Sequence, residues 1–178
     1  MKIVLLLLSL MSTALAHAQS IQPPALSARS WLLIDHASGQ SLVEHEADAR
    51  VEPASLTKLM TAYLTFAALK QGTLKLDQAV TVSERAWKAP GSRMFIDPKH
   101  PVTVGELIQG MIIQSGNDAC IALAEAIAGS EEAFAQRMNL EARRLGLANT
   151  HYVNATGLPD PQHYSTARLR RVAQTQRG

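Results

Sequence analysis

The sequence predicts an α+β domain in which one β-hairpin near the N-terminus is followed by several helices. Two observations support this prediction. The stretch "SWLLIDHASGQSLVEHE" places two apolar runs around a turn that contains a glycine, as a hairpin requires. From residue 55 onward, apolar residues recur in helical runs that end at glycines, prolines or capping residues. A chain of 178 residues is long enough for one such domain with its own core.

Residues 1–18 have the pattern of a secretory signal peptide. Lys2 forms a short basic region, residues 3–10 are almost entirely apolar, and Ala16-His17-Ala18 is a small-x-small cleavage pattern. The apolar stretch is shorter than the roughly 20 residues that a spanning helix needs. We therefore expect secretion and cleavage after Ala18. The alternative is a buried N-terminal helix.

The hairpin is expected to pair residues 31–34 with residues 41–44 across a turn at 35–40. Pro53 then marks a boundary, because proline is favoured in the first turn of a helix. A helix is predicted from Ser55 to Lys70, ending at Gly72. Its apolar side chains cover more than one face, which predicts burial on most sides.

The second half of the chain is expected to be helical between irregular segments. Residues 87–101 contain three prolines and a glycine, which predicts a long loop. Thr103 and Glu106 fit a capping box for the next helix. Further helices are predicted at 118–128, before Gly129, and at 131–145, where Ser130 can act as the cap. Residues 150–167 are expected to be extended and loop-like.

The composition excludes several classes of function. The formal charge is only +2, and the basic residues are scattered until the very end, so nothing indicates nucleic-acid binding. Cys120 is the only cysteine, so no internal disulfide can form, and its apolar helical run favours a buried position. The histidines are dispersed without ligand spacing. We expect no metal site and no cofactor.

Ser55 and Lys58 form the first candidate catalytic pair. Positions i and i+3 lie on one face of a helix, and a serine at a helix N-terminus has free backbone N–H groups around it. The hydroxyl could act as a nucleophile, with its own N–H helping to hold an oxyanion. Lys58 could serve as its base if the apolar neighbours lower its pKa. The alternative is a capping serine with a lysine that reaches solvent.

Ser115-Gly116-Asn117 forms the second candidate element, in a short link between two apolar helices. The Ser115 hydroxyl could pass a proton to a leaving group, and the Asn117 amide could hold a substrate carbonyl. The alternative is that both residues cap the helix that begins near Asp118.

In this order, the two elements resemble the penicillin-binding proteins and serine β-lactamases, whose signature is Ser-x-x-Lys, Ser-x-Asn and then Lys-Thr-Gly. The stretches "EPASLTKLMTAYL", "GSRMF", "LIQGMIIQSGNDACIALAEAIAGS" and "NTHYVNATGLPDPQHYSTAR" are similar more particularly to the low-molecular-mass D-alanyl-D-alanine carboxypeptidases, peptidase family S11. The resemblance covers about residues 31–168. It implies the serine β-lactamase/DD-peptidase-like transpeptidase fold.

The resemblance also implies a mechanism, a partner and a location. Ser55 would attack the bond between the last two D-alanines of a peptidoglycan stem peptide, and Lys58 would accept its proton. Ser115 would protonate the departing D-alanine, while Asn117 would hold the substrate backbone and orient Lys58. β-Lactams would act as inhibitors that acylate Ser55. The expected location is the periplasm.

The sequence departs from the family pattern after Asn117. Lys99 is the last lysine, so no Lys-Thr-Gly follows, and residues 168–178 contain four arginines and no acid. We therefore expect a signal peptide at 1–18, a partial catalytic domain at 19–167 without the later sheet strands, and an atypical basic tail at 168–178. A frameshifted or prematurely ended gene product would explain this pattern, and a native short form is the alternative. No membrane anchor is apparent.

These departures bear on stability and function. Apolar surface around Ser55, uncovered by later strands, would favour aggregation, so we expect poor stability and impaired activity. The alternative function is a non-catalytic penicillin- or wall-binding remnant. A class A-like β-lactamase is less favoured, because Gly116 stands where those enzymes usually have aspartate, and a D,D-endopeptidase would use the same catalytic residues. For His151, Tyr152, His163 and Tyr164 we expect packing or loop hydrogen bonds.

Overall fold

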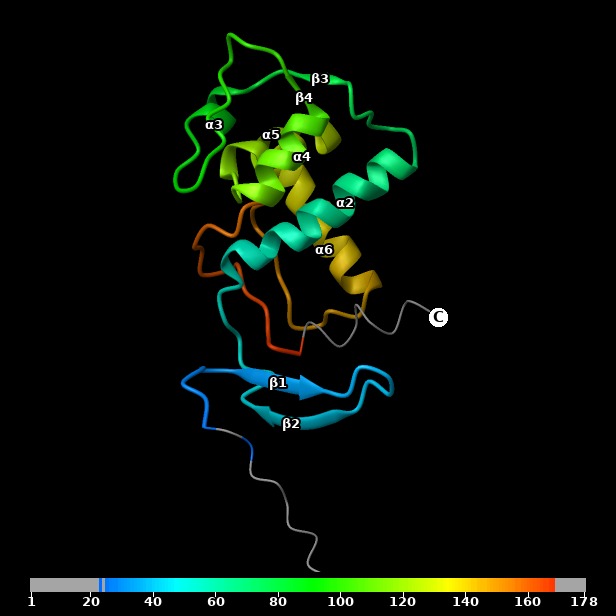
Figure 1. Cartoon of the computed structure of the whole chain (residues 1–178), viewed down its shortest axis with the longest axis vertical. Coiled ribbons are helices and arrows are strands. Elements are labelled where there is room, and N and C mark those ends of the chain that lie inside the picture. The colour runs from blue at the N-terminus through cyan, green and yellow to red at the C-terminus, as the bar shows by residue number, and fades with distance from the viewer. Residues whose placement is uncertain (1–22, 24, 169–178) are drawn as a thin grey trace, which may run out of the picture.

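The computed structural model describes residue 23 and residues 25–168 (Figure 1). The expected signal peptide at 1–18 and residues 169–178 of the expected basic tail lie outside this range. The elements, in chain order, are β1 (Trp31–Ile34), β2 (Ser41–His45), the 3-10 helix η1 (Ala54–Thr57), α2 (Lys58–Lys70), β3 (Ala79–Val80), α3 (Glu84–Trp87), β4 (Val102–Thr103), α4 (Val104–Ile113), α5 (Asn117–Ala128) and α6 (Glu131–Arg144).

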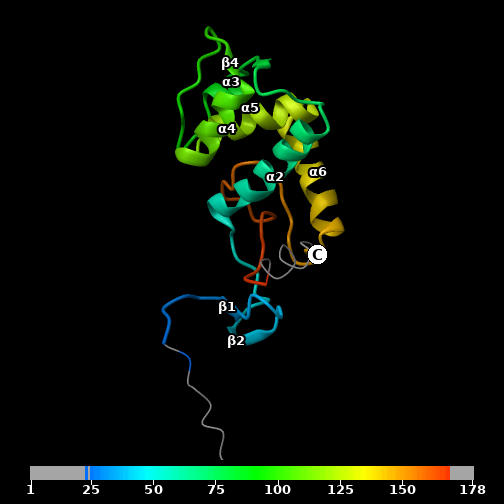
Figure 2. The same cartoon turned by 45° about the vertical axis from the view of Figure 1, so that its right-hand side comes forward.

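The β1–β2 hairpin lies apart from the helices, below them in Figure 1 and also in the turned view of Figure 2. The strands pair antiparallel, with Trp31 opposite His45 and an irregularity after Leu33. The Asp35 side chain accepts hydrogen bonds from the N–H and hydroxyl of Ser38, which shapes the turn. The predicted hairpin is therefore confirmed, with β2 one residue longer than expected.

Arg168 connects this hairpin to the end of the described chain. Its guanidinium forms ion pairs with Glu44 and Asp48, and its backbone N–H donates to the Ala47 carbonyl. Arg168, the first residue of the expected basic tail, thus contacts the hairpin and the residues that follow it.

Helix α5 lies at the centre of the helical part and packs against α2, α3, α4 and α6. Its residues 119–124 are buried, as are Phe134 and Met138 on α6. Cys120 is fully buried, as predicted, and this burial raises the pKa of its thiol to about 12. The thiol therefore stays protonated and acts as a small core side chain.

Local sequence signals place the helix ends. Thr103 and Glu106 form the predicted capping box of α4, and the Ser130 hydroxyl accepts from the Ala133 N–H at the start of α6. Gly129 ends α5 in a left-handed conformation. The short strands β3 and β4 were not predicted, and α3 includes Trp87, where the loop was expected to begin.

One prediction about α2 was wrong. Leu59, Tyr63 and Phe66 are exposed, together with Leu56 of η1, so one apolar stripe of the helix is not buried. Their spacing places them on one stripe, and Met60 and Ala68 are buried on another face. Exposed apolar surface near Ser55 agrees with the expectation from the sequence. The expected poor stability stays a prediction.

Candidate active site

Ser55 lies in η1, the single 3-10 turn that leads directly into α2. Pro53 precedes this turn and is buried, while Ser55 itself is exposed. Ala54 has a φ of 46°, in the left-handed region that non-glycine residues rarely occupy. Such backbone strain persists only where surrounding contacts hold it. The turn therefore presents the Ser55 hydroxyl outward from a fixed backbone.

Lys58 lies at the first position of α2 and points inward. Only 8% of the residue is exposed. Its Nζ donates to Asn117 Oδ1 and to the Thr156 carbonyl, both at 2.8 Å, and lies 3.4 Å from Ser55 Oγ. The amine thus has two firm acceptors and a longer contact to the hydroxyl. In a mechanism that begins with proton transfer from Ser55, this is where a base has to be.

Burial shifts the Lys58 amine toward its neutral form. The pKa of Lys58 is lowered because desolvation penalises the charged ammonium, and the nearby Cys120 opposes this shift. This is the direction that the apolar neighbours in the sequence predicted. A neutral amine can accept the Ser55 proton, whereas an ammonium cannot.

The turn between α4 and α5 carries Ser115 and Gly116, and Asn117 is the first residue of α5. Asn117 Oδ1 accepts from Lys58, its Nδ2 donates to the Pro90 carbonyl, and its backbone N–H donates to the Ser92 carbonyl. The capping alternative is wrong, because the N-cap of α5 is Gly116 and no side chain caps this end. Asn117 instead joins α5 to Lys58 and to the loop at 90–92.

Ser115 has a φ of 56° and is partly exposed. Within the described residues its hydroxyl makes no hydrogen bond to Ser55 or Lys58, so its place near the pair follows from Asn117, two residues on. The structure thus joins three of the four candidate residues directly by hydrogen bonds, and the fourth lies in the turn that precedes α5.

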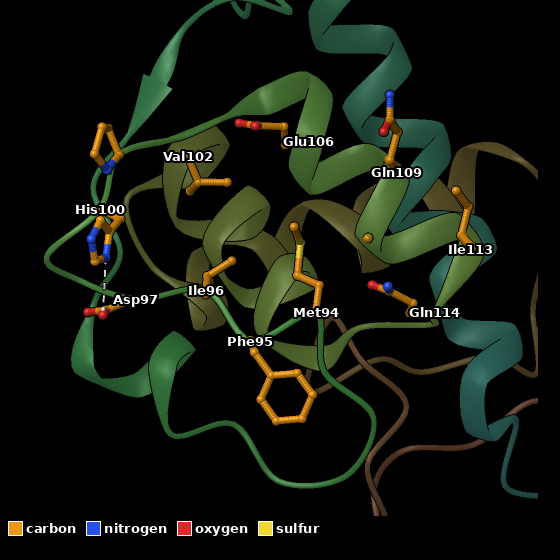
Figure 3. Close-up of a pocket in the computed structure, with 12 residues that line it drawn as sticks. Met94, Phe95, Ile96, Asp97, His100, Val102, Glu106, Gln109, Ile113 and Gln114 are labelled. Atoms are coloured by element: carbon orange, nitrogen blue, oxygen red, sulfur yellow. Dashed lines mark hydrogen bonds and ion pairs between the residues drawn. The ribbon is translucent and has the colours of Figure 1, made fainter.

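Figure 3 shows a cavity beside this turn, between α4 and the loop that precedes it. Its volume is about 460 Å³. Met94 lies on the loop side, Gln114 lies on the helix side, and Phe95 and Ile113 are largely exposed. Gln114 directly precedes Ser115, but none of the four candidate residues lines this cavity.

Asp118 fixes the loop side of that cavity. Its buried carboxylate accepts from the backbone N–H groups of Met94, Phe95 and Ile96, at 2.8 to 3.2 Å, and from that of Ala119. A carboxylate in the first turn of α5 is also favoured by the positive end of the helix. Asp118 is at least 22 positions away from these loop residues in the chain, so the contacts could not be predicted from the sequence.

We expect the replacement Asp118→Asn to destabilise the fold by about 2–3 kcal/mol, because an amide NH₂ would face N–H donors that now have an acceptor. Unfolding in urea, followed by circular dichroism, measures this change. Asp97→Asn is the matched control, because Asp97 accepts from the Lys99 N–H in the same loop but its side chain is 42% exposed. A loss no larger than that of the control would contradict the proposed role of Asp118.

A further group of site residues was not predicted individually. Residues 151–165 run beside the start of α2, and Thr61 Oγ1 donates to the Ala155 carbonyl at 2.7 Å. Thr57 contacts His163 from the same helical face. A signal for this group is present in the sequence, because threonine recurs at positions 57, 61 and 65. Such a spacing places three hydroxyls on one face of a helix, and all three residues are buried.

Within the described residues, no group of histidine, cysteine or acidic side chains is arranged to hold a metal ion. The helices of the same part of the chain are all too short or too polar to cross a membrane.

Comparisons with known proteins identify close relatives. The family model for D-alanyl-D-alanine carboxypeptidase, peptidase family S11, matches residues 17–175. The chain is 48% identical over 162 residues to the D-alanyl-D-alanine carboxypeptidase DacC of Escherichia coli, which covers 88% of this chain and 40% of the relative. It is 44% identical to DacF of Bacillus subtilis, over 80% of this chain and 37% of the relative.

Solved structures agree with this result. Penicillin-binding protein 5 from Haemophilus influenzae matches with a TM-score of 0.81 and 40% identity, over 86% of this chain and 46% of that one. Penicillin-binding protein D2 from Listeria monocytogenes, solved with ampicillin bound, matches with a TM-score of 0.75 and 29% identity, over 86% and 63%. The expected DD-peptidase fold is confirmed. The chain spans about 40% of the length of the curated relatives it matches.

Proposed function

Because this chain belongs to the peptidase S11 family of D-alanyl-D-alanine carboxypeptidases, we propose that it acts as a serine-type carboxypeptidase on peptidoglycan stem peptides that end in D-Ala-D-Ala. One observation supports this most strongly. Lys58 is buried, is held by Asn117, and reaches Ser55 Oγ at 3.4 Å. That geometry gives an exposed hydroxyl a base with a lowered pKa.

The proposed reaction has two steps. Ser55 Oγ attacks the carbonyl carbon of the penultimate D-alanine, and its proton passes to Lys58. The Ser55 N–H helps to hold the oxyanion. Ser115 relays the proton from Lys58 to the nitrogen of the terminal D-alanine as the C–N bond breaks, which leaves an ester on Ser55 and returns Lys58 to its neutral form. Water then hydrolyses this ester and releases the shortened peptide.

Asn117 has two parts in this proposal. Its Oδ1 orients the Lys58 amine at 2.8 Å, and in this proposal its Nδ2, which also donates to the Pro90 carbonyl, holds the substrate backbone. The Thr156 carbonyl accepts a second hydrogen bond from Lys58. With the two N–H bonds of the neutral amine engaged by these acceptors, its lone pair is left to face Ser55.

β-Lactams are the proposed inhibitors, because they would acylate the same hydroxyl. The ampicillin-bound structure of penicillin-binding protein D2 supports this proposal. We also propose export to the periplasm through the signal peptide at 1–18, which lies outside the described residues. The test for export is whether the mature N-terminus of the expressed protein begins after Ala18.

For the 178-residue stretch taken by itself, we propose a second function, which is binding of penicillin or stem peptide without turnover. The stretch contains the Ser-x-x-Lys and Ser-Gly-Asn motifs, and no lysine follows Lys99 in it. Two other activities would differ from the first proposal in their substrates. A D,D-endopeptidase would cut a cross-linked peptide, and a class A-like β-lactamase would hydrolyse the β-lactam itself.

Release of D-alanine from a soluble pentapeptide ending in D-Ala-D-Ala tests the proposal. We expect release by the wild-type chain, no release after Ser55→Ala, and none from a matched peptide ending in L-Ala-L-Ala. Labelling by a fluorescent penicillin, without release of D-alanine, would support the second function. A folded chain that neither releases D-alanine nor takes the label would contradict both.

A further inference from the structure

His163 is a buried histidine with two defined hydrogen bonds, and neither is part of the mechanism above. Only 2% of the residue is exposed. The Val153 backbone N–H donates to Nδ1 at 3.2 Å, and Nε2 lies 2.8 Å from Thr57 Oγ1. Because a backbone N–H can only donate, Nδ1 must be the acceptor and carries no proton. The proton of the neutral ring is therefore on Nε2, which donates to Thr57.

Thr57 is the residue through which His163 reaches the candidate site. It lies in η1 directly before Lys58 and two residues after Ser55, and only 1% of it is exposed. No side chain caps the start of this 3-10 turn. The hydrogen bond from His163 therefore supports the backbone between Ser55 and Lys58 from outside the turn.

The segment at 151–165 is itself anchored to α6. The Asn139 side chain exchanges hydrogen bonds with the backbone N–H and carbonyl of Tyr152. Glu131, which is buried and paired with Arg85, accepts from the Ala155 N–H. Because it is anchored in this way, the segment at 151–165, called the frame below, can hold the turn at 54–57 in place.

The same frame contacts the chain on both sides of the nucleophile turn at three further points. Val51, before the turn, exchanges two backbone hydrogen bonds with Ser165. The Thr156 carbonyl accepts from Lys58, and the Ala155 carbonyl accepts from Thr61. His163 joins the beginning of this frame, at Val153, to the turn itself, at Thr57.

We propose that neutral His163 is a positioning residue for the Ser55–Lys58 pair, and that its protonation in acid releases the turn. This inference rests on the proposed function, because it concerns how the same pair is held. A protonated ring would present Nδ1–H to the Val153 N–H, placing donor against donor. The ring would then have to move away from Val153, from Thr57 or from both.

The charges around the ring set its response to pH. Burial lowers the pKa of His163, while Asp160 acts to raise it and His151 acts to lower it. Among the described residues, Tyr152 lies against the edge of the ring and Lys58 lies beyond Thr57. The other titratable or charged groups that line a cavity with His163 are Arg29, Arg50, Glu52 and Tyr164.

Burial favours the neutral form of His163 in the folded protein. The stability that the neutral ring contributes is therefore present above the ordinary histidine pKa of about 6.5, and it is lost as the pH falls below 6.5 and the ring becomes protonated.

The rate of acylation by a fluorescent penicillin, measured against pH, tests the proposal in the whole chain. Thr57→Val keeps the shape but removes the acceptor, and we expect it to slow acylation about tenfold at neutral pH. His163→Gln can still donate to Thr57 but does not titrate, so we expect near-normal acylation at neutral pH with a weaker loss in acid. His36→Gln is the matched control, because His36 is exposed in the hairpin turn, away from Thr57 and His163.

Nuclear magnetic resonance of the histidine rings provides a second readout that does not need activity. We expect His163 to be the neutral Nε2–H form at neutral pH, and its titration to move the amide signals of Thr57 and Lys58 with the same midpoint. An Nδ1–H ring, or amide signals that do not follow the titration, would overturn the proposal. The proposal would also be overturned if the acylation rate of His163→Gln fell in acid as much as that of the wild type and Thr57→Val was acylated at the normal rate.

The two readouts separate this inference from the proposed function. If the wild-type chain takes no label, the proposed function is contradicted, and the resonance measurement alone decides the role of His163. If the wild type is labelled and the variants behave like it, the carboxypeptidase proposal survives while the positioning role of His163 does not.

Discussion

Replacing Lys58 with methionine is expected to slow the acylation of Ser55 by penicillin about 10²–10⁴-fold, the range typical of a lost general base. Methionine matches the length of the buried stem but has no proton acceptor. The amine that now lies 3.4 Å from Ser55 Oγ is removed, while the exposed hydroxyl stays in place. The measurement is the second-order rate of covalent labelling, with circular dichroism to confirm that the variant folds.

Lys70→Met is the matched control for this change, because Lys70 lies at the exposed far end of the same helix. The control should acylate at the wild-type rate. In the wild type, the rate should also rise with pH and then level off below the ordinary lysine pKa of about 10.5, because the lowered pKa of Lys58 governs the supply of neutral amine. A Lys58→Met variant that acylates normally would exclude Lys58 as the base.

Replacing Gly157 with alanine is expected to disrupt both the fold and the site. A Cβ at this position would lie 1.8 Å from the Ala54 carbonyl oxygen and 3.0 Å from Thr57 Oγ1. The backbone φ of 86° is also unfavourable for any residue with a Cβ. Because Ala54 directly precedes Ser55, either Gly157 or the nucleophile turn must move. We expect a loss of about 3–5 kcal/mol in the free energy of unfolding, together with a loss of acylation.

Gly129→Ala separates the close contact from the backbone strain. Gly129 has nearly the same φ, 85°, but a Cβ there would meet nothing within 4 Å. We expect only the strain, about 1–2 kcal/mol, and normal acylation. Urea unfolding and penicillin labelling of the two variants give the comparison. Equal losses in both would show that the approach of residue 157 to Ala54 does not hold the turn.

The parts of the fold that the sequence predicted are those fixed by local signals. Gly39 and the apolar runs around it specify the hairpin, and Thr103 with Glu106 specifies the start of α4. Gly129 specifies the end of α5. The two-residue strands β3 and β4 are too short to produce an alternating pattern, so they escaped prediction.

The burial of α2 was predicted wrongly for a related reason. Apolar side chains on several faces of a helix favour burial, but whether a face is covered depends on which segments pack against it. Met60 and Ala68 are buried on one face of α2, while Leu59 and Phe66 are exposed on another. The sequence of the helix alone cannot distinguish these two faces.

The candidate site was predictable where its chemistry is local. Ser55 and Lys58 are three residues apart, so helical geometry alone brings them together. The acceptors that hold Lys58 are 59 and 98 residues away in the chain, at Asn117 and Thr156. Asn117 was found through its motif, whereas the Thr156 carbonyl is a backbone group and has no signature in the sequence.

The central claim is that Ser55 is the residue that becomes acylated, and peptide mapping after labelling tests it most directly. Trypsin cleaves after Arg50 and Lys58, so Ser55 is the only serine in the peptide 51–58, while Ser115 falls in the separate peptide 100–137. We predict that mass spectrometry of the penicillin-treated chain finds one adduct, in peptide 51–58 and on Ser55. An adduct in peptide 100–137, or none on a folded chain, would contradict the assignment of Ser55 as the nucleophile.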